Sequence, residues 1–70
     1  MLIWTIYDHP KDFPDHYVAR QWWVDDKGGM AQEMLLKAET LPALRRMLPP
    51  GLYRLDASEG DDAVIVETWI

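Results

Sequence analysis

Apolar and polar residues alternate along several short segments of the chain. Residues 2–7 and 16–24 are rich in β-branched and aromatic types, and a turn-forming sequence with aspartate follows each of them. Such segments are typical of β-strands, because branched and aromatic side chains pack well on a pleated surface. Residues 52–55 and 63–70 predict two more strands, separated by a polar turn over residues 56–62.

Residues 33–39 fit either a helix or a strand, because helix-forming residues also alternate there. We favour a strand, since a helix start follows directly. Thr40 is a suitable N-cap, and Pro42 is tolerated only in the first turn of a helix. The sequence Pro-Pro-Gly at residues 49–51 stops the chain again, so the helix is predicted over residues 41–48.

These elements predict one compact α+β domain over residues 1–70, with a small antiparallel sheet of four to five strands and one short helix packed on one face. One short helix cannot cover all the apolar surface of such strands. Adjacent Trp22 and Trp23 point to opposite faces of a regular strand, so at least one indole needs a second cover. We expect a largely aliphatic face against the helix and an aromatic face opposite it.

The aromatic face is the leading candidate for a binding surface, because aromatic residues are enriched at protein interfaces. Seventy residues without cysteine form a small core with no disulfide, and such domains depend on oligomerisation or on rich apolar packing. We therefore expect a protein partner or a homodimer. The candidate interface residues are Tyr7, Trp22, Trp23, Ile65 and Trp69. Alternatively, loops or residues 30–39 cover this face and the protein is an ordinary monomer.

The charge of the chain argues against nucleic acid as a partner. Twelve acidic and 7 basic residues give a net charge of −5, which disfavours attraction to phosphate backbones. We also expect neither a signal peptide nor a membrane span, since Asp8 interrupts the first apolar run early and no long apolar run follows. The absence of cysteine fits a reducing compartment, and the predicted location is the cytoplasm.

Three aspartates and two histidines lie between residues 8 and 16. Imidazole and carboxylate groups bind divalent metals, so His9, Asp12 and His16 are candidate ligands, and a metal-binding or small hydrolytic protein is the alternative function. The spacing matches no tight metal motif, and the same residues can cap turns or pack on Phe13 or Tyr17. We expect no cofactor and no enzymatic activity, because the chain is small for a catalytic pocket.

Arg45, Arg46 and Arg54 are candidates for a weak site for anions or nucleic acid near the end of the predicted helix. The alternative is structural. Cations stabilise the C-terminal end of a helix, and the numerous acidic residues offer salt-bridge partners.

Three segments carry a resemblance to a known group of proteins. They are residues 6–20 (IYDHPKDFPDHYVAR), 48–52 (LPPGL) and 65–70 (IVETWI). With these segments the chain resembles a family of short bacterial and phage proteins that has no assigned activity. The resemblance implies a small α+β unit in the cytoplasm, and it implies no catalytic or binding residue.

Overall fold

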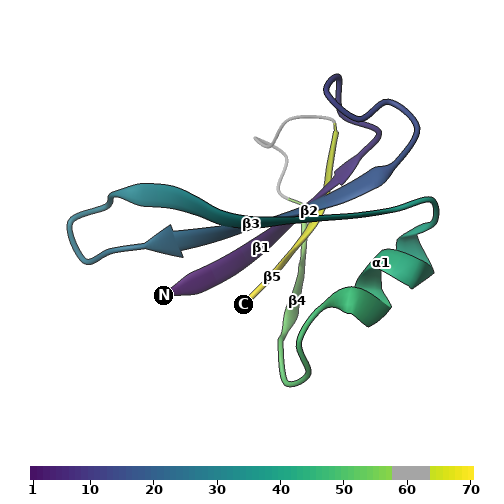
Figure 1. Ribbon diagram of the computed structural model, residues 1–70. Helices are drawn as coiled ribbons and strands as arrows, with labels where there is room; N and C mark the ends of the chain where they lie inside the picture. The colour runs from purple at the N-terminus through teal and green to yellow at the C-terminus, as the bar shows by residue number, and fades with distance from the viewer. Residues whose placement is uncertain (58–63) are drawn as a thin grey trace.

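The computed structural model describes residues 1–57 and 64–70, and it places five strands and one helix in them. The strands form one antiparallel sheet in the order β3-β2-β1-β5-β4 (Figure 1). The predicted α+β class is therefore confirmed. The elements are β1 (Leu2–Asp8), β2 (Tyr17–Val24), β3 (Met30–Ala38), α1 (Leu41–Met47), β4 (Arg54–Asp56) and β5 (Ile65–Trp69).

The segment that fitted both helix and strand is a strand, and β3 is longer than the predicted residues 33–39. It extends back to Met30 because a tight turn joins it to β2. In this turn Asp25 Oδ1 accepts hydrogen bonds from the backbone N–H groups of Lys27 (2.9 Å) and Gly29 (2.7 Å). Gly28 takes a φ of 81°, which a side chain would disfavour. The β2–β3 hairpin consequently reaches beyond the other strands (Figure 1).

Helix α1 begins where the sequence predicts it. The Thr40 side chain accepts a hydrogen bond from the backbone N–H of Ala43 (3.3 Å), and Pro42 lies in the first turn. The helix ends at Met47, one residue earlier than predicted, because Leu48 is already extended with a ψ of 149°.

The C-terminal strands begin later than predicted. β4 begins at Arg54, although Tyr53 already pairs with Ile70 through two backbone hydrogen bonds of 2.8 and 3.0 Å. The predicted turn at residues 56–62 lies outside the described residues, apart from Asp56 in β4 and residue 57. The first residue of the predicted last strand, residue 63, lies outside them as well.

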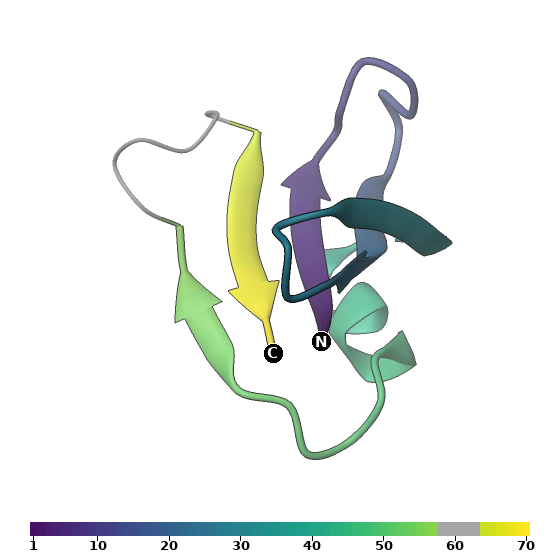
Figure 2. The ribbon, with the colours of Figure 1, turned by 90° about the vertical axis from the view of Figure 1, so that its left-hand side faces the viewer.

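The buried core lies on one face of the sheet, which we call the core face. Trp4 and Ile6 of β1, Ala19 of β2 and Leu44 of α1 form one buried cluster. Figure 2 shows β4, β5 and β1 next to one another, with the β2–β3 hairpin crossing in front of β1. The partly buried hydrophobic residues packed against the cluster are Tyr17, Leu36, Ala38, Leu41, Leu48, Leu52, Val66 and Trp69.

The sheet faces differ from those that the sequence predicts. The register of β5 against β1 shifts by one residue, so Val66 has no partner there and Ile65 lies opposite Tyr7, whereas Trp69 lies opposite Trp4. The prediction that Ile65, Trp69 and Tyr7 share one face is therefore wrong, because a β-bulge reverses the alternation of side chains. The core face carries the aromatic residues Trp4, Tyr17 and Trp69 among its aliphatic ones.

Candidate functional site

A buried carboxylate joins the helix to the sheet. Glu67 of β5 is only 1% exposed. The Arg45 guanidinium donates two hydrogen bonds of 2.8 Å, from Nε to Oε1 and from an Nη atom to Oε2. Arg54 donates to Oε2 (3.3 Å), and the Trp69 indole N–H donates to Oε1 (3.1 Å). Both carboxylate oxygens of Glu67 are thus satisfied, as a buried charge requires.

The partners of Glu67 set its protonation. Burial by itself raises the pKa of this carboxyl, but the hydrogen bonds from Arg45, Trp69 and Arg54 outweigh burial and hold the pKa of Glu67 below its ordinary value. The same contact raises the pKa of the Arg45 guanidinium. Glu67 is therefore ionised at neutral pH.

The lowered pKa of Glu67 predicts that the protein becomes less stable in acid. Because the pKa is lower in the folded chain than in the unfolded chain, the stabilisation is fully present above the ordinary value of 4.5 and is lost as the pH falls through the folded value. We expect the urea midpoint to stay level above about pH 5 and to fall below it. Glu67→Gln, which cannot ionise, is expected to show a smaller fall over the same range. Equal pH dependence in both proteins would contradict the role of Glu67.

Only two of the three arginines of the predicted cluster come together. The anion that they contact is a carboxylate of the same chain. Arg45 and Arg54 converge, but on the Glu67 carboxylate of the same chain, and Arg54 also lies 3.5 Å from Asp56. Arg46 is exposed and does not join them at Glu67. A site for anions or nucleic acid at these three arginines stays a prediction, and the Glu67 carboxylate already engages two of them. Sequence reasoning missed Glu67, although a glutamate in the middle of an apolar strand was the available signal.

The predicted metal ligands do not come together. His9 Nδ1 contacts the carboxylate of Asp8, the His9 ring lies edge-on to Tyr17 with 4.9 Å between centroids, and Asp12 pairs with Arg20. No group of three or more His, Cys, Asp or Glu within residues 1–57 and 64–70 is arranged to hold a metal ion. The metal hypothesis for His9, Asp12 and His16 stays a prediction, and neighbouring side chains already engage His9 and Asp12.

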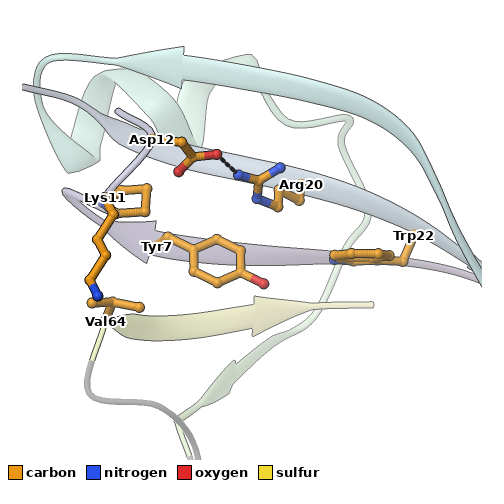
Figure 3. Close-up of a pocket in the computed structure, with 7 residues that line it drawn as sticks. Tyr7, Lys11, Asp12, Arg20, Trp22 and Val64 are labelled. Carbon is orange, nitrogen blue, oxygen red and sulfur yellow. Dashed lines mark hydrogen bonds and ion pairs between the residues drawn. The ribbon is translucent and has the colours of Figure 1, made fainter. Parts of the chain in front are cut away.

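The face opposite the core, which we call the open face, carries a cavity of about 590 Å³. Arg20 of β2 forms one wall, held by the Gln32 amide oxygen (2.9 Å) and by the Asp12 carboxylate. Its guanidinium also lies over the Tyr7 ring, 5.6 Å from the centroid. Lys11 and Val64 lie at one end and Trp22 at the other, with Tyr7 between them (Figure 3). The residues that line the cavity are Tyr7, Pro10, Lys11, Asp12, Arg20, Trp22 and Val64.

The five predicted interface residues are divided between the two faces. Tyr7, Trp22 and Ile65 belong to the open face, because Trp22 follows the alternation of Arg20 and Ile65 pairs with Tyr7. Trp23 lies opposite Leu2 on the core face, and Trp69 packs against the core cluster there. One continuous aromatic face is therefore not present among the described strands.

Exposed apolar surface is nevertheless present on the core face. Trp23, Leu2 and Met34 are 47%, 44% and 51% exposed. Met34 lies opposite Gln21, so it shares the core face with Trp23. We call Leu2, Trp23 and Met34 the uncovered patch. The apolar excess expected from the sequence thus exists, but on the face that also holds the buried core.

β3 is an edge strand beside this patch. Among the described strands it pairs with β2 alone, and it is nine residues long. The β2–β3 register shifts beside Trp22, which leaves Glu33 without a cross-strand partner on β2. Glu33 and Lys37 are both exposed along the strand, and the Lys37 ammonium lies 5.1 Å from the centre of the Phe13 ring.

Comparisons with protein-family models, curated proteins and solved structures found no match to this chain. The resemblance to a family of short bacterial and phage proteins stays a prediction. Within the described residues, no helix has the length and apolar character that a membrane crossing requires.

Proposed function

We propose that the protein is a non-enzymatic, cytoplasmic self-association module, in which the β3 edges of two copies pair to form one continuous sheet. The observation that carries the proposal is a nine-residue edge strand beside the uncovered patch of Leu2, Trp23 and Met34. An edge strand presents backbone N–H and C=O groups that can pair with another chain. In this arrangement α1 packs on the core face of its own chain, and the partner chain covers more of that face.

The charges of β3 support pairing with a second copy. In an antiparallel pair with its two-fold axis at Leu35, Glu33 of each chain lies opposite Lys37 of the other, because 33 and 37 are equally distant from 35. Opposite charges in cross-strand positions attract, each pair contributing about 0.2–1 kcal/mol. The register therefore creates two identical ion pairs, as a symmetric interface requires.

The same register covers part of the uncovered patch. It sets Met34 of each chain opposite Leu36 of the other, on the same face. Leu36 packs against the core cluster that includes Leu44, so Met34 gains a further apolar neighbour from the partner chain. Burial of such side chains contributes about 25 cal/mol per Å² of apolar area. The small size of the core makes this addition significant for a chain of 70 residues.

Charge reversal tests the register. Glu33→Lys and Lys37→Glu each set like charges opposite each other in the pair, so we expect each variant to dimerise about fivefold or more weakly, from a change of about 1–3 kcal/mol. The double variant Glu33→Lys/Lys37→Glu restores opposite charges and is expected to regain the dimer. Gel filtration with light scattering and sedimentation equilibrium measure the mass, which is twice 8.2 kDa for the dimer.

An equimolar mixture of the two single variants tests the pairing again. One chain of the mixed dimer carries lysine at both positions and the other carries glutamate at both, so each cross-strand pair again joins opposite charges. We therefore expect the mixture to regain the dimer, although each variant alone is weak.

Matched controls separate the strand contact from net charge. Asp26→Lys and Lys27→Glu make the same changes of charge in the exposed β2–β3 turn. Neither is expected to weaken the dimer. A monomeric parent protein would overturn the proposal, and so would a double variant or an equimolar mixture that remains as weak as the single variants.

A further inference from the structure

We propose that the open-face cavity binds a small aromatic carboxylate, with its ring against Tyr7 and Trp22 and its acid group toward Lys11 and Arg20. The site lies on the face opposite the uncovered patch, so this inference does not depend on self-association. A volume of about 590 Å³ lies within the range of about 300–1,000 Å³ that is typical of small-molecule sites.

The first support is a fixed cation in the cavity wall. Two acceptors hold the Arg20 guanidinium, one from the loop before β2 (Asp12) and one from β3 (Gln32). The ring of Tyr7 lies beneath it, with 5.6 Å between the guanidinium carbon and the centroid. A guanidinium held in this way is preorganised, so binding of a carboxylate costs little side-chain entropy.

The second support is the balance of charge in the lining. Among the described residues that line the cavity, Asp12 is the only carboxylate, and its partner is Arg20. Lys11 has no hydrogen bond or ion pair with any residue of the described part of the chain. The described residues of the lining therefore carry one more positive than negative charge, whereas the whole chain has a net charge of −5. An anion is the ligand charge that this excess favours.

The third support is the apolar part of the lining. Tyr7 and Trp22 supply aromatic surface, and Pro10 and Val64 supply aliphatic surface. The Trp22 indole N–H and the Tyr7 hydroxyl have no acceptor within residues 1–57 and 64–70. Aromatic side chains attract planar rings at centroid separations of about 4.5–7 Å, and their free donors can meet the oxygens of an acid. A ring that carries one carboxylate matches both the apolar and the charged parts of the lining.

Benzoate is the probe for this site, with benzamide as its neutral counterpart and acetate as the anion without a ring. We expect saturable shifts in ¹H–¹⁵N NMR spectra at the Trp22 indole N–H and at the backbone amides of Tyr7 and Arg20. Benzoate is expected to bind at least fivefold more tightly than benzamide or acetate at constant ionic strength. Equal binding of benzoate and benzamide, or shifts confined to another indole, would overturn the proposal.

Lys11→Gln tests the charge of the site in a folded protein, because Lys11 is exposed. The variant is expected to weaken benzoate binding at least threefold and to leave the thermal midpoint unchanged. The matched control Lys27→Gln removes an exposed lysine from the β2–β3 turn and is expected to bind benzoate as the parent does. Full binding by Lys11→Gln would count against the site.

Discussion

Glu67→Ala is expected to lower the free energy of unfolding by about 3 kcal/mol, the lower end of the range for breaking a buried ion pair. Glu67 is 1% exposed, and its removal leaves the Arg45 guanidinium and the Trp69 indole N–H without their acceptor. A buried donor without an acceptor loses its hydration as well as its hydrogen bond. The loss stays at the lower end because Arg45 is partly exposed and water can reach it.

Asp56→Ala is the matched control, since Asp56 also contacts Arg54 but its side chain is 82% exposed. An exposed ion pair contributes little, so we expect a change within about 0.5 kcal/mol. Urea denaturation at pH 7, followed by tryptophan fluorescence, measures both variants. If the two losses were equal, burial would not be the source of the effect. Glu67→Gln keeps the shape of the side chain and is expected to fall between the parent and Glu67→Ala.

Leu44→Ala is expected to cost about 3 kcal/mol of stability, within the range of about 2–5 for leucine to alanine in a core. Leu44 is the only buried residue of α1, and it is fully buried. A helix of seven residues is too short to be stable alone, so it depends on this contact. Alanine has a higher helix propensity than leucine. The loss of stability therefore reports lost packing rather than weaker helix formation.

Met47→Ala is the control on the same helix, because Met47 is 47% exposed. We expect a loss below about 1 kcal/mol, as for most exposed positions. A second measurement follows the Glu67 carboxyl by NMR. Arg45 directly follows Leu44, so loosening α1 is expected to bring the pKa of Glu67 back toward its ordinary value. An unchanged pKa of Glu67 in Leu44→Ala would show that the helix stays in place without its buried leucine.

Local signals predicted the elements well because each depends on neighbours in the chain. Thr40 and Pro42 place the helix start, and the turn at Asp25 and Gly28 joins two strands within a few residues. The choice of a strand rather than a helix for residues 33–39 also rested on a local signal, because a helix start follows this segment directly.

The candidate site was predicted less well, because its parts are far apart in the sequence. Glu67 meets Arg45 across 22 residues and Arg54 across 13. Arg20 meets Gln32 across 12 residues, and it meets Asp12 across 8. None of these pairs follows a helix or strand period, so no pattern in the sequence indicated them.

The fold class, the strand-rich order of elements, the start of the helix and an apolar surface larger than one short helix can cover all followed from the amino-acid sequence. These properties follow from local propensity and from the total of apolar residues. Which face of the sheet each side chain occupies depends on how the strands pair in the folded chain. The bulge opposite Tyr7 shifts the register by one residue and so separates Ile65 from Trp69. Side chains alternate along a strand, so one extra residue moves its neighbours to the other face, and no local signal marks its place.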